Sequence, residues 1–231
     1  MRRNRRRQSR AAHRVPGLRA RRRGFTLLET MLTLVIVAVG VAGVFDAYQS
    51  FFRTNQWSSR TATASLLAAE IRELSRNLPR HDGVTGLTLD ISGGGPVAVG
   101  WGLEPGEVSV ADIDDIDDLD GLLFTFAGDD LQSLEFAGPI DAAGNLVPQY
   151  VLTATDQASG ATFTYGWQQR VEVTKIDSFD YGTDLDDSYF EAGVPGRGVG
   201  DFPLRVTVTV LYQDFFDPEP LPITSVSWIV P

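Results

Sequence analysis

The residues best suited to chemistry in this 231-residue chain are the aspartates of one short run, ADIDDIDDLDG at residues 111–121. Six carboxylates within nine residues repel one another unless water or a cation neutralises them. Ca²⁺ takes six to eight oxygen ligands of this kind. The run is therefore a candidate calcium site, with Asp114, Asp115, Asp117, Asp118 and Asp120 as its ligands. A solvated acidic surface loop is the favoured interpretation.

The spacing of the run differs from that of an EF-hand. Reading back from Asp120 and Gly121, Ile116 stands where a ligand belongs. The apolar residues Ile113, Ile116 and Leu119 recur at every third position. This pattern predicts a turn-rich segment that is held by apolar anchors.

A second acidic stretch, rich in glycine, covers residues 177–201 and includes Asp184, Asp186 and Asp187. A loop of this length in a compact domain is usually functional or disordered. It could order around a metal or against a neighbouring subunit, but a plain surface loop is the favoured interpretation.

An enzyme is not indicated. The chain has no cysteine, and beyond residue 24 its one histidine is His81, next to Asp82. A Ser-His-Asp arrangement stays open, but no G-x-S-x-G pattern accompanies it, and we expect His81 to be a solvated turn residue. No phosphate-binding loop is present either, because the glycines at 93–95 precede a proline and begin no helix.

A further carboxylate stands inside a long apolar stretch. Residues 25–45 read FTLLETMLTLVIVAVGVAGVF, with Glu29 as the one charged residue. As a helix these 21 residues would span about 31 Å, close to the hydrocarbon thickness of a bilayer. A charge within a membrane segment costs a few kcal/mol, so Glu29 is a candidate functional residue.

The charge is divided sharply between the start of the chain and the rest. Residues 1–24 hold eleven arginines and no acid, which leaves nine basic and all 30 acidic residues for positions 25–231. The basic segment cannot bury enough apolar surface to fold. By the positive-inside rule it stays in the cytoplasm, and the acidic remainder, with a net charge of −21, is exported. Such a body repels phosphate, so no nucleic-acid partner is expected.

The junction RRRGFTLLET, followed by the apolar stretch, resembles the leader of type IV prepilins and of type II secretion pseudopilins. The resemblance implies that prepilin peptidase cuts after Gly24 and that Phe25 becomes the N-methylated first residue. It also implies that Glu29 pairs with the terminal amine of a neighbouring subunit during assembly. A buried carboxylate beside a buried ammonium offsets the desolvation of both. The rival interpretation is a twin-arginine export signal at Arg22 and Arg23, which Glu29 disfavours.

Four regions follow from these patterns: a cleaved leader at 1–24, a transmembrane half-helix at 25–45, an amphipathic half-helix at 46–78 and an exported head at 79–231. No proline occurs between Phe25 and Pro79, so one helix can run to Leu78. Its second half carries an apolar stripe at helical spacing, formed by Leu67, Ile71, Leu74 and Leu78.

The head alternates in period two and predicts strands at 84–91, 96–101, 121–127, 147–155, 162–176, 203–213 and 222–230. In the clearest strand Val206, Val208, Val210 and Tyr212 face one way. Its expected partner points Val226, Trp228 and Val230 inward. The sequence therefore predicts an α+β fold, in which a long N-terminal helix packs against an antiparallel sheet, as in pilins.

Within that family, the apolar helix followed by ASLLAAEIREL is similar to PilV-like minor pilins and to minor pseudopilins. The resemblance implies a structural subunit of a pilus or secretion filament. Its partners would be other pilins, prepilin peptidase and the inner-membrane assembly platform. It would cross the bacterial inner membrane once, with a periplasmic or extracellular head, and no cofactor is indicated beyond the candidate Ca²⁺. The alternative is an anchored or exported envelope binding protein that does not polymerise.

Overall fold

The computed structural model describes residues 25–84, 86–155, 157 and 160–231. The chain divides into two units, one that ends at Arg53 and one that comprises Thr54–Pro231. The predicted boundaries at residues 24, 45 and 78 stay predictions. Gly24 lies outside the described residues.

The helix α1 runs without interruption over Leu27–Ser75 (49 residues), which confirms the long N-terminal helix with slightly shorter ends. It begins after Thr26, whose side-chain Oγ1 accepts a hydrogen bond from the backbone N–H of Glu29 at 3.3 Å. Thr and Glu at this spacing match the sequence of a capping box, and an acid in the first turn is favoured by the helix dipole. The helix ends four residues before Pro79.

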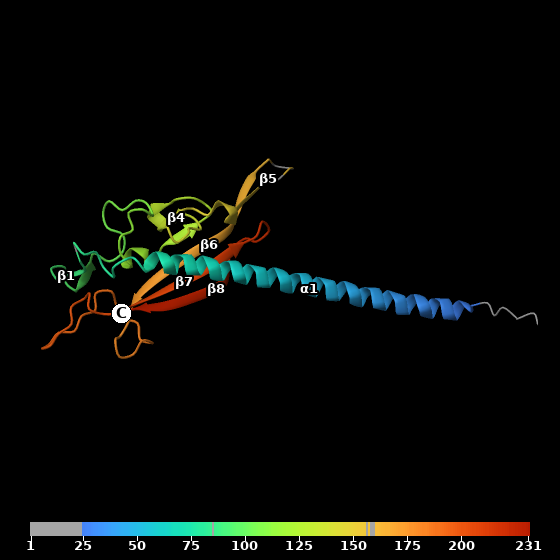
Figure 1. Ribbon diagram of the computed structural model, residues 1–231, viewed down its shortest axis with the longest axis horizontal. Helices are drawn as coiled ribbons and strands as arrows, with labels where there is room; N and C mark the ends of the chain where they lie inside the picture. The colour runs from blue at the N-terminus through green and yellow to red at the C-terminus, as the bar shows by residue number, and fades with distance from the viewer. Residues whose placement is uncertain (1–24, 85, 156, 158–159) are drawn as a thin grey trace, which may run out of the picture. The chain divides into compact units, whose positions relative to one another are not determined.

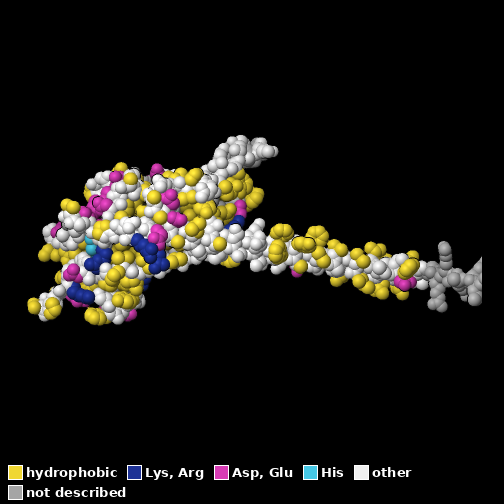
Figure 2. Space-filling model, in the orientation of Figure 1, with side chains coloured by type: hydrophobic (Ala, Val, Ile, Leu, Met, Phe, Trp, Pro, Cys, Tyr) yellow, Lys and Arg dark blue, Asp and Glu magenta, His cyan; other side chains and the backbone are white. Residues whose placement is uncertain are grey.

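The part of α1 up to Arg53 carries no buried residue. Its large apolar side chains are exposed: Leu34 has 69% of its surface exposed and Phe51 has 65%. By length and composition α1 can cross a membrane. On the face shown in Figure 2, hydrophobic side chains lie along this part of the helix, with few acidic ones between them.

The part of α1 that belongs to the second unit has one buried stripe, made of Ala64, Leu67, Ala68, Ile71 and Ser75. Leu74 and Leu78 are half-buried and pack against the same core. The predicted amphipathic stripe is therefore confirmed. The residues it faces come from the head, chiefly Phe124, Val171, Val206 and Val208.

The head is built on a six-stranded sheet of order β4-β3-β6-β7-β8, in which β5 also pairs with β6. Its strands are β3 (Leu123–Thr125), β4 (Glu135–Ala137), β5 (Val151–Thr155), β6 (Thr162–Lys175), β7 (Leu204–Gln213) and β8 (Leu221–Val230). Figure 1 shows β6, β7 and β8 running side by side along α1. A separate hairpin pairs β1 (Thr88–Asp90) with β2 (Val97–Val99). The α+β class is confirmed.

The alternation predicted for β7 is seen in the structure. Val206, Val208 and Val210 are fully buried, while Arg205, Thr207 and Thr209 are half-buried on the other face. The register sets Val206 opposite Trp228 and Val208 opposite Val226, as expected for two strands that share one inward face. β8 contributes less to the hydrophobic core than β7 does, because its inward residues are only half-buried.

The sheet departs from the prediction in one respect. It is mixed, because β3 and β4 pair in parallel, whereas the other described pairs are antiparallel. The strand β4 has no counterpart among the predicted strands, and it is only three residues long. Three residues carry one full alternation at most, too little for a period-two pattern to mark.

A buried amide joins the helix to the sheet. Gln169 on β6 is fully buried, and its Nε2 donates to the carbonyl of Leu67 at 2.9 Å and to that of Ile140 at 3.1 Å. Its Oε1 accepts from the backbone N–H of Ile140 at 2.8 Å. All the bonds run to backbone groups, so this side chain satisfies polar atoms that packing would otherwise leave unpaired.

Candidate functional site

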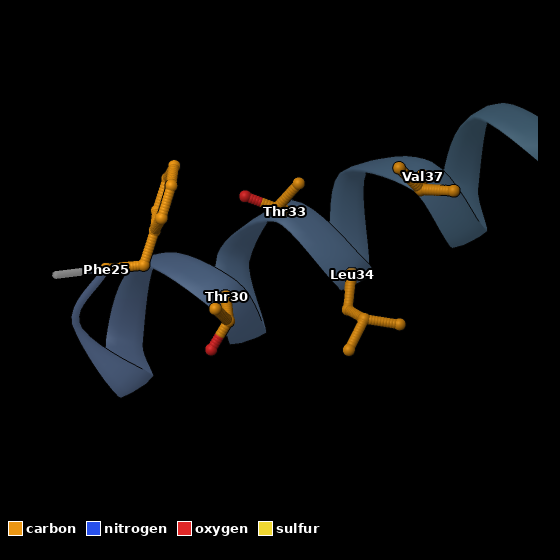
Figure 3. A pocket seen from close by; sticks show the side chains of 5 residues that line it. All are labelled: Phe25, Thr30, Thr33, Leu34 and Val37. Atoms are coloured by element: carbon orange, nitrogen blue, oxygen red, sulfur yellow. The ribbon is translucent and has the colours of Figure 1, made fainter.

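Two places carry the residues that the sequence singles out. The first is the start of α1, where Phe25 precedes the helix with 79% of its surface exposed. Figure 3 shows its ring beside a shallow groove on the outside of the helix, lined by Thr30, Thr33, Leu34 and Val37. The groove is apolar and open.

Glu29 lies in the first turn of α1, and its side chain is exposed. The first basic residue that follows it in the chain is Arg53, about 36 Å further along the helix. Within the described part of this unit, therefore, no basic side chain of the helix can reach the carboxylate.

The second place is the acidic run, which the structure folds into the interior of the head. Ile113, Ile116 and Leu119 are all buried, as the anchor pattern predicts. The segment Asp117–Leu119 is a turn of 3₁₀ helix, a geometry that sets residues three apart on one side. The backbone N–H of Ile116 also donates to the carbonyl of Pro79 at 2.9 Å, which ties the run to the chain just past α1.

These anchors bury the aspartates between them. Asp115, Asp117 and Asp118 have no exposed surface, so the run differs from a solvated surface loop. Asp118 Oδ2 accepts from the backbone N–H groups of Asp114 and Asp115 at 3.0 and 3.3 Å, and Asp115 Oδ1 accepts from that of Asp118 at 3.0 Å. Each of the two carboxylates has its other oxygen buried without a hydrogen-bond partner among the described residues.

Two glutamates outside the run complete the cluster. Glu104 and Glu107 lie on either side of a Pro-Gly turn, and Glu107 Oε2 accepts from the backbone N–H of Glu104 at 2.7 Å. Both oxygens of Glu104 are buried without a partner among the described residues. One oxygen from each of Glu104, Glu107 and Asp118 falls within 4.8 Å of the others, and so does one from each of Asp114, Asp115 and Asp118.

The electrostatics of the cluster oppose charge. Burial raises the pKa of Asp115, Asp118 and Glu104 above the ordinary range of a carboxyl. Neighbouring carboxylates raise the pKa of Asp115 and Glu104 further, whereas the backbone N–H groups of Asp114 and Asp115 act in the opposite direction on Asp118. The pKa of the exposed Asp114 is raised as well, by partial desolvation and by the charges of Asp82 and Glu107. These shifts show that the cluster disfavours negative charge on its carboxyl groups.

Two of the predicted ligands lie in other contacts. Asp117 Oδ1 is 2.9 Å from Nδ1 of His81, whose side chain is only 10% exposed and lies 6.2 Å from the ring of Trp101. Asp120 accepts from Trp101 Nε1 at 3.0 Å and from the backbone N–H of Val173 at 2.8 Å. The prediction that His81 is a solvated turn residue is therefore wrong, because Asp117 and Trp101 enclose it.

The second acidic stretch, residues 177–201, is held by its own turns. Asp177, Asp180 and Asp186 accept hydrogen bonds from backbone N–H groups two or three residues ahead. Asp184 pairs with Arg205 on β7. Within the described part of the chain, these acids form no group with the spacing of a metal site.

Glu104 and Glu107 are the residues that sequence reasoning missed. They stand seven or more residues upstream of Asp114, and only the path of the loop between β2 and β3 brings them to Asp118. The available signal is a pair of acids flanking Pro105-Gly106, shortly before the acidic run.

Comparison with known families concerns the first place. A family model described as a prokaryotic N-terminal methylation motif matches residues 19–45. The match contains Gly24, Phe25 and Glu29 and ends with the apolar stretch. No curated protein and no solved structure matches the chain significantly. The N-terminal segment therefore carries a prepilin-like methylation motif, as its resemblance predicts.

Proposed function

We propose that this protein is a minor pilin or minor pseudopilin, a structural subunit of a type IV pilus or of a type II secretion-like filament. The methylation motif at residues 19–45 is the observation that carries the proposal. Prepilin peptidase cuts between Gly24 and Phe25, and the new amino group of Phe25 is methylated. The mature chain then begins two residues before α1.

The exposed half of α1 supports an assembly role. Its apolar side chains from Leu27 to Phe52 have no cover within the described chain. Lipid covers them while the protein is a single-pass protein of the inner membrane, with the basic leader in the cytoplasm and the head exported. Neighbouring pilin helices cover them in the filament, and the assembly platform transfers the subunit from one environment to the other.

Glu29 is the residue that we assign to recognition between subunits. Its carboxylate sits in an apolar surface with no basic side chain near it on its own helix. The methylated amine at Phe25 of the adjacent subunit supplies the opposite charge. Removing either member of a buried ion pair leaves the other uncompensated, so the pairing fixes the axial position of one subunit against the next.

The proposed role is structural rather than catalytic. The enclosed pair of His81 and Asp117 is the arrangement closest to a catalytic one that we find in the described residues, and it has no serine nucleophile at its side. Both side chains are enclosed by the head, where they join the acidic run to the end of α1. If the protein were an anchored hydrolase, its activity should disappear when His81 is changed.

The test is the intact mass and N-terminal peptide map of the protein isolated from its native membranes. The expected product starts at methylated Phe25. A start near Val44 or Tyr48 would indicate an exported soluble protein, and an uncut leader would indicate a plain membrane anchor. Either result would overturn the proposal.

A pair of substitutions serves as the control. Gly24→Val places a branched side chain at the cut and should leave the leader attached. Gly24→Ala adds only a methyl group and should retain most processing. Equal processing of the two variants would argue that the cut lies elsewhere.

A further inference from the structure

We infer that the head binds one Ca²⁺ ion through Asp118, with Glu104 and Glu107 from the preceding loop and Asp114 and Asp115 from the acidic run as the other ligands. The inference concerns the head alone and does not depend on the proposed filament role. It alters the ligand set expected from the sequence, because two glutamates replace Asp117 and Asp120.

Buried oxygens without partners are the first argument. Asp115 and Asp118 have no exposed surface, yet Asp115 Oδ2 and Asp118 Oδ1 accept no hydrogen bond from any described residue. The same holds for both oxygens of Glu104. An unpaired buried carboxylate is costly, and native proteins satisfy such groups with a partner. Asp118 belongs to both candidate groups, so a cation held beside its carboxylate would satisfy buried oxygens of the cluster.

Geometry is the second argument. Within each of the two groups that share Asp118, the oxygens lie no more than 4.8 Å apart. Two ligands on opposite sides of a Ca²⁺ ion are separated by about 4.8 Å, twice the usual Ca–O distance. One ion can therefore contact every oxygen of a group without a large movement. Asp114 is exposed and the two glutamates are half-buried, so the ion has a route from solvent and water can complete its shell.

The ligand chemistry favours calcium over other metals. Both groups consist of carboxylates alone, with no nitrogen or sulfur donor, and hard oxygen ligands suit Ca²⁺ and Mg²⁺. Mg²⁺ requires near-ideal octahedral geometry and keeps its water, whereas Ca²⁺ accepts six to eight ligands in an irregular array. These oxygens come from a short 3₁₀ turn, which carries Asp118, and from the irregular loop on its N-terminal side.

Calcium would stabilise a part of the head that no strand holds in place. Between β2 and β3 the chain runs for more than twenty residues, with one short 3₁₀ turn as its regular structure. The ion would join the Glu104 side of this loop to the Asp118 side. Because the backbone N–H of Ile116 donates a hydrogen bond to the carbonyl of Pro79, the bound ion would also hold the loop against the chain that follows α1.

The experiment uses the full chain in detergent, treated with a chelator and titrated with CaCl₂ or MgCl₂ by calorimetry and by thermal unfolding. We expect one Ca²⁺ per chain and a rise in Tm of about 5 °C or more at millimolar Ca²⁺, with a smaller response to Mg²⁺. Glu104→Gln and Asp118→Asn should weaken Ca²⁺ binding by about tenfold or more. Glu104→Gln is the safer variant, since Asp118 also caps two backbone groups.

The matched control is Glu172→Gln, which removes an exposed acid from the middle of β6 and should leave Ca²⁺ binding unchanged. The inference is overturned if Ca²⁺ at about 5 mM, above the range of weak extracellular sites, changes neither heat nor Tm. It is also overturned if both ligand variants, Glu104→Gln and Asp118→Asn, bind Ca²⁺ as the wild type does. A Tm that falls with rising pH and ignores Ca²⁺ would show that the carboxyl groups share protons instead, and would overturn it too.

Discussion

The two parts of α1 place the same kinds of side chain in opposite surroundings. Up to Arg53, Leu34 has 69% of its surface exposed and Val37 has 56%. From Thr54 onward, Leu67 and Ile71 have 1% and 0%. Both parts belong to one uninterrupted helix, so the difference lies in what covers them. The second part is covered by the chain's own sheet, whereas the first depends on lipid or on other molecules.

This contrast separates two kinds of stability. Burying an apolar side chain against the sheet contributes to the unfolding free energy of a single chain. Burying the same side chain against a neighbouring helix contributes to association and depends on concentration. Substitutions at equivalent positions in the two parts should therefore affect different measurements.

The largest effect is expected at Glu29. Glu29→Ala and Glu29→Gln should leave processing at Phe25 intact, while incorporation into filaments falls by about a hundredfold or more. Loss of one member of a buried ion pair costs about 3–5 kcal/mol. The measurement compares sheared filaments with membranes by immunoblot. Glu29→Gln keeps the side-chain shape, so normal incorporation of this variant would refute the role of the charge.

A pair of leucines tests the contrast directly. Leu67→Ala should lower the free energy of unfolding of the head by about 2–5 kcal/mol, because it leaves a cavity between α1 and the sheet. Leu34→Ala makes the same chemical change at an exposed position and should alter that value by less than about 0.5 kcal/mol. Denaturant unfolding of the full chain in detergent measures both. Equal losses would mean that the first part of α1 also packs within the single chain.

The fold could be predicted from the sequence only where a local pattern extends over enough residues. The stripe around Leu67 and the alternation of Val206, Val208 and Val210 are long enough to be recognised, and both are confirmed. The parallel pairing of β4 with β3 depends on contacts between distant segments, which no local pattern records.

The acidic run shows the limit for the site. Its apolar anchors were visible in the sequence, and they do enter the core. Their consequence was not foreseen, because aspartates between such anchors are drawn into the interior with them. The approach of Glu104 to Asp118 depends on the path of an irregular loop. The match over residues 19–45, by contrast, rests on a contiguous motif, which sequence alone reveals.

A third effect should appear with pH at Lys175, which is fully buried and donates to the carbonyl of Asp187. Burial lowers its pKa from 10.5 to about 8, although Asp187, Asp186 and Asp117 act in the opposite direction. Between pH 8 and 10.5 the folded protein releases this proton while the unfolded chain keeps it, so stability rises with pH in this window. Below pH 8 both states are protonated and the cost of burial is fully present.

The measurement is the unfolding free energy of the wild type and of Lys175→Met at several pH values. Across this window the unfolding free energy of the wild type should rise, relative to that of the variant, by at most about 3 kcal/mol. Below the window the difference between the two should not change with pH. A wild type that instead loses stability relative to Lys175→Met as the pH rises would contradict the assignment.

The smallest effect is expected where α1 first meets the sheet. Arg60 Nη2 lies 2.7 Å from Asp214 Oδ2, and its guanidinium stacks over the ring of Tyr212 at 4.2 Å. The side chains of Arg60 and Asp214 are 32% and 41% exposed, so Asp214→Asn should cost no more than about 1 kcal/mol, and the cost should vanish near 1 M salt. Arg60→Ala should cost more and keep part of its effect in salt, because it also removes the packing on Tyr212. Unfolding at low and high ionic strength measures both variants, and a large, salt-independent loss for Asp214→Asn would show that the pair is part of the packed core.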